Sequence, residues 1–338
     1  MPLVVVIAAG AGLTFGSTAC GDADQGDEAD EPCDCRPDGP ALYEAMTALT
    51  SSAPELAELV DYGDSFDKIA GSSFDGSDLL ALHIGDPESD LPKPVLFIVA
   101  GHHGNEEVGP AMALRFADWL VDRYDCDDDA RLFVDTLDIW IVPTVNPDAL
   151  GEGRTNANGV DLNRNHSFAW EPGDGHGEGP ASEPEVAALE ELVAARFGPS
   201  RPPEEAAPAP PSTAGLFVSL HAPYSQVLWP WAHTTGPAPN AEGMATLARR
   251  VATHAGYEAG QTSQALYGIS GCATDWVYGT FGVASLLVEI GPRKAPNHET
   301  MDRIVWPALA GALREAARLA PAPYQAAPGR YEPPATDE

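Results

Sequence analysis

Basic residues are scarce in this sequence. Lys and Arg together number 18 against 51 Asp and Glu, which gives a formal net charge of −33 at pH 7. A surface of that sign repels the phosphates of DNA and RNA, so the composition argues against nucleic acid as a partner. The acidic stretch 21–40 carries only part of the excess. We interpret the charge as a solvated, solubilising surface, with recognition of a cationic substrate as the alternative.

Cysteines are also few, and their spacing does not suit a thiolate metal centre. The chain has five, and none of them form a Cys-x-x-Cys pair. This excludes a zinc-finger type of site. The spacing of Cys33, Cys35, Cys126 and Cys272 does not determine any disulfide pairing.

Long apolar runs are missing as well. Residues 2–19 are apolar, but they are too short and too interrupted by glycine for a good membrane span, and no Lys or Arg precedes them. They resemble the apolar part of a signal peptide. Because the run ends in GSTACG, we predict a lipoprotein-type signal over 1–20, with Cys20 lipidated and the protein held outside the cytoplasm. A secreted or periplasmic protein without the anchor, and a cytosolic protein, are the alternatives.

Apolar segments with strand character alternate with segments of helical spacing along the rest of the chain. Strands are expected within 78–85, 93–101, 137–147, 215–222, 227–232 and 283–291, and helices within 106–124, 182–197, 241–256 and 299–320. Two short helices are expected in 41–63, separated by a break at 51–54. This alternation predicts an α/β domain with a largely parallel sheet buried on both faces.

The domain is expected to cover residues 41–322. An acidic linker, 21–40, precedes it, and a tail, 323–338, follows it. Residues 198–213 are rich in Pro and Ala and are expected to form an irregular insertion.

Polar residues stand where four of the expected strands end. These residues are His103, Asn146, His221 and Glu289. In open α/β sheets, functional residues collect at the carboxyl ends of the strands, so the four predict a common site. Glu106 follows His103 by three residues, and at the start of a helix this spacing brings both side chains to one side. A close pair with a distant third ligand is typical of a zinc site.

Several short motifs follow one another along the chain in an order that resembles a known protein family. The segments HGNE (103–106), NPD (146–148), RTNANGVDLNRN (154–165), SEPE (182–185), SLHAPYSQ (219–226), LYGISGCATDW (266–276) and LLVEIG (286–291) follow one another in the chain. Together they resemble the zinc metallocarboxypeptidase family, which is carboxypeptidase A/B-like and has bacterial members that include murein peptide amidase. The resemblance implies a three-layer α/β/α sandwich around a twisted, mixed sheet.

The resemblance also assigns roles to individual residues. It implies one Zn²⁺ per chain, held by His103, Glu106 and His221. It makes Asp161 the residue that orients His103, and it makes Glu289 the catalytic glutamate.

Further residues match the part of the family's site that binds substrate. Arg154 matches the arginine that polarises the scissile carbonyl, and Asn163, Arg164 and Tyr267 match the residues that hold a terminal carboxylate. Thr274 matches the base of the side-chain pocket, which favours a small or neutral residue, although the neighbouring Asp275 leaves a polar one open.

The leading interpretation is a zinc-dependent exopeptidase that hydrolyses C-terminal peptide bonds. The main alternative is a murein peptide amidase acting on cell-wall peptides. A desuccinylase- or aspartoacylase-like amide hydrolase and an inactive peptide-binding homologue are further alternatives. The expected partner is therefore a peptide or muropeptide substrate, with membrane association only through Cys20.

Overall fold

The computed structural model describes residues 39–71, 76–85, 92–201 and 207–326. The predicted signal segment lies outside these residues. The strands are β1 (Ala57–Asp64), β2 (Asp78–Ile84), β3 (Val95–Ala100), β4 (Asp138–Val142), β5 (Leu216–His221), β6 (Gln226–Trp229), β7 (Glu258–Gln261) and β8 (Ala284–Glu289). The α-helices are α1 (Gly39–Ser52), α2 (Phe66–Ala70), α3 (Val108–Asp122), α4 (Asp128–Thr136), α5 (Pro184–Phe197), α6 (Ala241–Ala255), α7 (Thr262–Ala265), α8 (Ala273–Phe281), α9 (His298–Thr300) and α10 (Trp306–Leu319).

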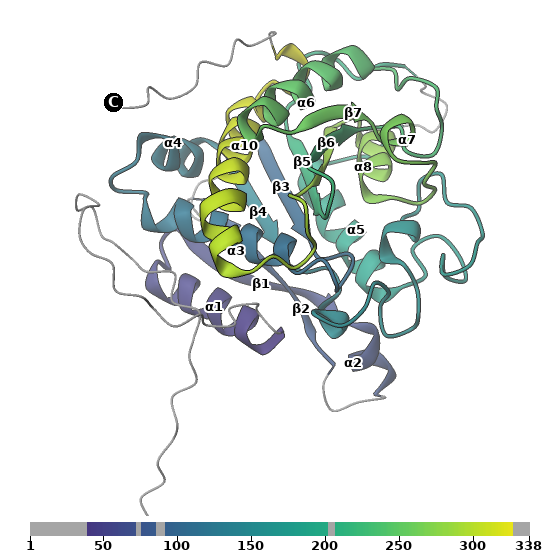
Figure 1. Ribbon diagram of the computed structural model, residues 1–338, viewed down its shortest axis with the longest axis horizontal. Helices are drawn as coiled ribbons and strands as arrows, with labels where there is room; N and C mark the ends of the chain where they lie inside the picture. Colours follow the sequence, from purple (N-terminus) through teal and green to yellow (C-terminus); the bar gives the residue numbers. More distant parts are fainter. Residues whose placement is uncertain (1–38, 72–75, 86–91, 202–206, 327–338) are drawn as a thin grey trace, which may run out of the picture.

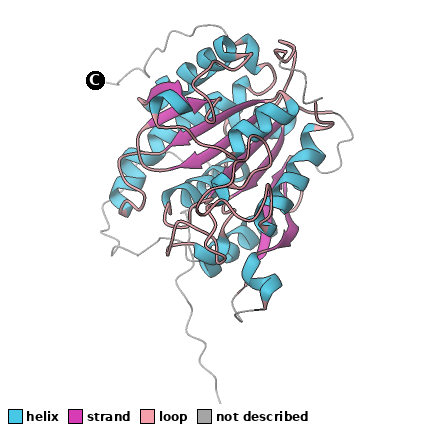
Figure 2. Cartoon of the chain, turned by 90° about the vertical axis from the view of Figure 1, so that its right-hand side faces the viewer, coloured by secondary structure: helices cyan, strands magenta, loops and turns pink. Residues whose placement is uncertain are grey.

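The strands form a single mixed sheet in the order β1-β2-β4-β3-β5-β8-β6-β7. The central strands β4, β3, β5 and β8 are parallel to their neighbours in this group. Antiparallel pairs join β1 to β2, β2 to β4 and β6 to β8. Figure 2, turned from the view of Figure 1, shows helices on either side of the sheet. The predicted three-layer α/β/α fold with a mixed, largely parallel sheet is confirmed.

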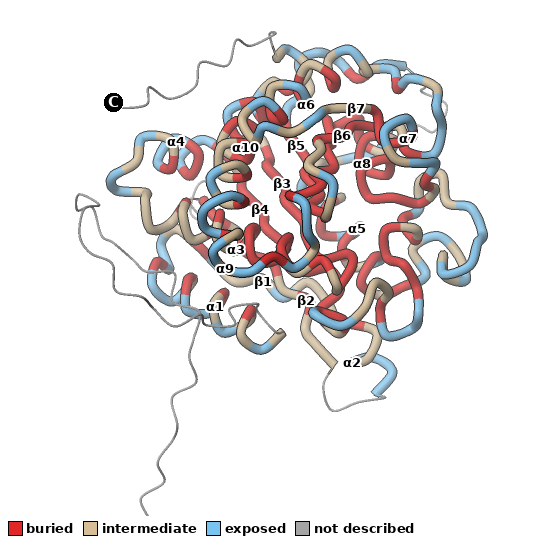
Figure 3. Tube along the Cα trace, in the orientation of Figure 1, coloured by how far each residue is buried: buried red, intermediate tan, exposed pale blue. Residues whose placement is uncertain are grey.

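Alternating side chains of the central strands β3, β4 and β5 belong to two separate hydrophobic cores. Because successive side chains of a strand point to opposite faces, a strand covered on both sides must be apolar throughout. In β3, Leu96, Ile98 and Ala100 pack into one core, and Val95, Phe97 and Val99 pack into the other. Figure 3 shows β3, β4 and β5 as buried segments.

The core that contains Leu96 also includes side chains from α1, α3, α4, α6 and α10. The core that contains Phe97 includes side chains from α5 and α8. In Figure 1, α3 and α10 lie in front of the sheet. Within the described ranges, the helices are all too short or too polar to span a bilayer.

The prediction of two short helices in 41–63 is half wrong. The chain breaks after Ser52 as expected, but residues 57–64 form β1 and not a second helix. This segment pairs with β2 along its length, and α5 packs against it. The apolar residues of 57–64 are compatible with a helix or with a strand. The segment forms a strand because pairing with the edge of β2 satisfies its backbone hydrogen bonds.

The parallel pairing sets the position of the strand ends. Ala100 is the register partner of Leu220, and His221 is the register partner of Glu289. The chain that leaves β3 therefore emerges beside His221 and Glu289, at one edge of the sheet.

Candidate active site

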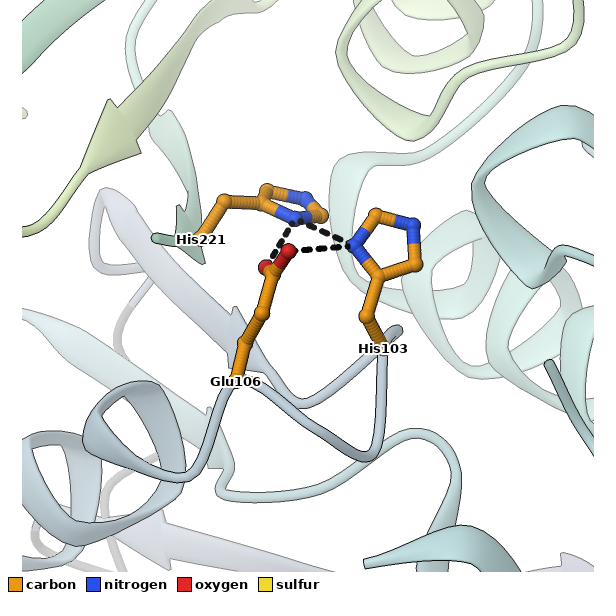
Figure 4. Close-up of side chains that lie close together, drawn as sticks. All are labelled: His103, Glu106 and His221. Atoms are coloured by element: carbon orange, nitrogen blue, oxygen red, sulfur yellow. Dashed lines mark hydrogen bonds and ion pairs between the residues drawn. The ribbon is translucent and has the colours of Figure 1, made fainter. Parts of the chain in front are cut away.

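His103, Glu106 and His221 converge at this edge. The Nδ1 atom of His103 lies 3.1 Å from one carboxylate oxygen of Glu106, and the Nδ1 atom of His221 lies 3.1 Å from the other. The two Nδ1 atoms are 3.3 Å apart. Figure 4 shows the three side chains pointing toward one another. All three residues are buried, with exposed fractions between 2% and 4%.

A close backbone approach holds the segment that bears two of these residues. A Cβ atom at Gly104 would lie only 1.9 Å from the carbonyl oxygen of Ala149, so no other residue fits there without movement. The backbone of 104–105 exchanges hydrogen bonds with Gly151 and Gly153, at 2.8 Å each. This contact places the loop that carries Arg154 directly against the triad.

The triad fits a zinc ion. Donor atoms held 2.0–2.2 Å from a tetrahedral zinc lie about 3.3–3.6 Å apart, close to the observed separations. Two ring nitrogens that face each other share at most one proton, whereas a cation satisfies both lone pairs. Two histidines and one carboxylate are also a donor set that leaves a coordination position open for catalysis. The predicted zinc ligands are therefore confirmed as a group that can hold the ion.

The outer nitrogen of each histidine has its own partner. Nε2 of His103 lies 3.0 Å from Asp161, as the resemblance implied, and Nε2 of His221 lies 3.1 Å from the hydroxyl of Ser219. Such partners keep the proton on the outer nitrogen and leave Nδ1 free to bind metal. Ser219 was not predicted. It lies two residues before His221 in β5, and the period of a strand puts both on one face.

The neighbouring charged and hydrogen-bonding groups of the site shift one another's pKa values. Burial would raise the pKa of Glu106, but hydrogen bonds from His103 and His221 hold it well below its ordinary range. Burial would likewise raise the pKa of Asp161, and His103 and the nearby arginines hold it low. Burial lowers the pKa of His221, which favours the neutral form that binds metal.

His103 behaves differently from His221. Burial would lower its pKa, but hydrogen bonds to Asp161 and Glu106 outweigh that effect and raise it. These hydrogen bonds favour the protonated form of His103, so a metal ion would compete with a proton for this residue.

Glu289 lies beside the triad, in the same cleft. Burial raises the pKa of Glu289 to about 8, and the negative charge of Glu106 adds to the rise. A cation bound by the triad opposes this shift, because positive charge favours the ionised carboxylate. Oε2 of Glu289 is buried and makes no hydrogen bond within the described part of the chain. A carboxylate in this state is suited to exchanging a proton with a small molecule in the cleft.

The predicted arginines also reach the cleft. Arg154 binds Asp161 through Nε and Nη2, both at 2.9 Å, and its Nη1 lies 3.8 Å from Glu106. Arg164 lies 3.4 Å from the hydroxyl of Tyr267, and both side chains line the cleft. Tyr267 is 56% exposed and stands at the mouth.

Asn163 is held next to the triad. Its side-chain oxygen accepts a hydrogen bond from the backbone of Ala273, and its side-chain nitrogen lies 3.4 Å from Nε2 of His221. Asn163 is buried and lines the cleft.

Thr274 and Asn146 do not join the cleft. Thr274 is buried, with its hydroxyl 3.6 Å from the sulfur of Cys272. Cys272 packs against Ala232 and Ile269. Burial raises the pKa of the Cys272 thiol to about 12, so it stays protonated at neutral pH. Asn146 is buried and donates a hydrogen bond to the backbone oxygen of His102, the residue before His103.

Lys294 was not predicted as a site residue from the sequence. This residue lines the cleft, and its Nζ lies 3.1 Å from Glu106. A signal was present, because Lys294 follows Glu289 by five residues and thus leaves the same edge of the sheet.

We expect Asp161→Asn to weaken zinc binding about 10- to 100-fold, because the amide no longer holds the outer proton of His103 as a carboxylate does. Competition with a chelator of known affinity measures the change. Asp174→Asn, an exposed carboxylate changed in the same way, is the control and should bind zinc as the wild type does. Equal zinc affinity in Asp161→Asn and the wild type would contradict the orienting role.

Comparison with known proteins agrees with the site. A family model described as zinc carboxypeptidase matches residues 42–308. Mouse carboxypeptidase A4 is 27% identical over 270 residues, covering 70% of this chain and 58% of the relative. A zinc carboxypeptidase of Saccharothrix mutabilis subsp. capreolus is 27% identical over 292 residues, covering 78% and 64%. The chain thus spans less than two thirds of the length of these relatives.

Solved structures share the fold. The crystal structure of thrombin-activatable fibrinolysis inhibitor superposes with a TM-score of 0.70 at 20% identity, covering 84% of this chain and 74% of that one. The family match extends over most of the described residues and includes the His103–Glu106–His221 triad. This chain belongs to the zinc carboxypeptidase family.

Proposed function

We propose that this protein is a zinc-dependent exopeptidase that removes residues from the C-terminal ends of peptides. The observation that carries the proposal is one cleft lined by two functional groups of residues. The first group is the triad with Glu289, and the second is Arg164 with Tyr267, whose side chains contact each other. The first group suits hydrolysis of an amide bond, and the second suits recognition of a free carboxylate.

The hydrolytic chemistry follows from the residues around the triad. The triad would hold a zinc ion, which would supply the acidity for a bound water molecule and the polarisation of a carbonyl group. Glu289 accepts a proton at its buried Oε2 and returns it to the leaving amine. Arg154 is anchored by Asp161 through two of its nitrogens, so its Nη1 stays directed toward the cleft. From there it donates to the oxygen that gains negative charge.

Selection of chain ends depends on Arg164. A planar guanidinium binds a carboxylate through two parallel hydrogen bonds, and an amide in the interior of a peptide offers no such partner. Nη1 of Arg164 is tied to the carbonyl of Asn163 at 2.8 Å, which holds the guanidinium in place. Tyr267 lies close enough to share the bound carboxylate.

Release of C-terminal residues should stop when a zinc chelator is added, and Glu289→Gln should lower kcat about 10²- to 10⁴-fold while zinc content is unchanged. Mass spectrometry of the released products and metal analysis of the protein measure both effects. Glu191→Gln, an exposed residue changed identically, should retain full activity. Turnover by Glu289→Gln at the wild-type rate would refute its role as the base.

Arg164→Ala should lower kcat/KM for peptides with a free C-terminal carboxylate about 10- to 100-fold, through loss of a charged hydrogen-bonding partner. The same peptides with an amidated end should lose much less. Arg303→Ala, at a side chain that is 79% exposed, controls for the loss of charge. Equal losses on both kinds of peptide would favour an amidase, such as one acting on muropeptides.

We propose further that the protein works outside the cytoplasm, tethered by a lipid at Cys20. The support is the apolar, small-residue run 2–19 that ends at this cysteine.

Expression of the full chain in a bacterium that processes lipoproteins tests the anchor. The wild type should partition into detergent and carry acyl chains by mass spectrometry, whereas Cys20→Ala should stay in the aqueous phase. The Cys33→Ala variant, changed within the same stretch, should behave as the wild type. An aqueous wild-type protein without acyl chains would exclude the anchor.

A further inference from the structure

Lys294 lines the catalytic cleft and has no role in the chemistry described above. Its backbone oxygen accepts a hydrogen bond from the amide of Val108 at 3.0 Å, which fastens the loop after β8 to the start of α3. Its Nζ lies 3.1 Å from Glu106 and 3.4 Å from the side-chain oxygen of Asn105. Because the backbone fixes the loop, the side chain can be changed without releasing it.

The partner of Lys294 is itself a metal ligand. When a divalent cation takes the oxygens of Glu106, the carboxylate has less charge to offer the ammonium group, and the cation repels it. The side chain of Lys294 is 36% exposed, so it has room to turn into the cleft. A lysine on a flexible stem adapts to such a change more easily than an arginine.

With zinc and a terminal carboxylate bound, the charges of the cleft would leave one positive charge for a second anion to balance. Glu106, Glu289 and Asp161 balance the three cations Arg154, Arg164 and Lys294. Zinc adds two positive charges, with the histidines neutral. A terminal carboxylate cancels one of these charges, and one positive charge remains. Transfer of a proton from water to Glu289 does not alter this balance.

The position of Lys294 indicates where that anion lies on the substrate. Arg164 contacts Asn163, Tyr267 and, at 4.0 Å, Asp161. Lys294 contacts Asn105 and Glu106 instead, so the two cations line the same cleft from different groups of residues. If Arg164 holds the carboxylate of the leaving residue, Lys294 is placed to meet the other side of the scissile bond.

We propose that Lys294 is a specificity-determining residue that binds a carboxylate on the residue just before the scissile bond. This inference rests on the proposed exopeptidase activity and names its substrate class: peptides whose penultimate residue is acidic. The carboxylate can belong to the side chain of an α-linked Asp or Glu. It can equally be the α-carboxylate of a γ-linked glutamate, which also lies close to the bond.

Two pairs of peptides test the proposal on the zinc-loaded protein. One pair carries α-linked Glu or Gln as the penultimate residue, and the other carries γ-linked glutamate or its α-amide. We expect kcat/KM to favour the charged member of at least one pair about 5- to 20-fold, as for a partly exposed charged hydrogen bond. The pair that shows the preference identifies the source of the carboxylate.

Three variants separate Lys294 from general charge effects. Lys294→Met should abolish the preference for the charged peptide, and Lys294→Arg should retain most of it. Arg293→Met removes a positive charge from the neighbouring, exposed position and should leave the preference intact. If Lys294→Met shows the same preference as the wild type, or if the wild type shows none in either pair, the proposal is wrong.

A binding measurement keeps this inference separate from the proposed activity. Isothermal titration of the same peptides into zinc-loaded Glu289→Gln needs no turnover. Tighter binding of the charged peptide, lost in the double variant Glu289→Gln/Lys294→Met, supports the role of Lys294 even if no peptide is hydrolysed. Equal affinity for the charged and neutral members of both pairs overturns it.

Discussion

The site depends on the parallel pairing of β3, β5 and β8. Because these strands are neighbours and run in the same direction, the chain leaves each of them at the same edge of the sheet. His221 and Glu289 are register partners there, and the segment after β3 brings His103 and Glu106 to meet them. Two apolar cores hold the strands from both faces, so the polar groups stand on a rigid support.

Glu106 is the electrostatic centre of this arrangement. Its two oxygens contact both histidines, and the cations Arg154 and Lys294 approach the same carboxylate. Buried charges of this kind are stable only when they are paired. A metal ion held by the triad would compete with these two cations for the carboxylate. The acidic and basic groups around the cleft balance one another, although the net charge of the whole chain is −33, so this balance is a local property of the site.

Most of the fold was predictable from the sequence. The central strands are continuous apolar runs, and such runs identify strands that are buried on both faces. Residues 57–64 were misjudged, since their mixed pattern suits a helix or an edge strand, and the neighbouring β2 settles the choice. The metal ligands were also predictable, because the motifs around His103, Glu106 and His221 resemble those of the zinc metallocarboxypeptidase family, and that resemblance implied the ligand set.

The sequence by itself determined which residue types stand at the strand ends, and therefore the class of chemistry. Only the tertiary structure decided which groups meet. It places Ser219 on the outer nitrogen of His221, and it buries Thr274, which is not among the residues that line the cleft. It also sets Lys294 against Glu106, across 188 positions of sequence. Contacts of that range follow from strand order and backbone packing, which no local pattern of residues encodes.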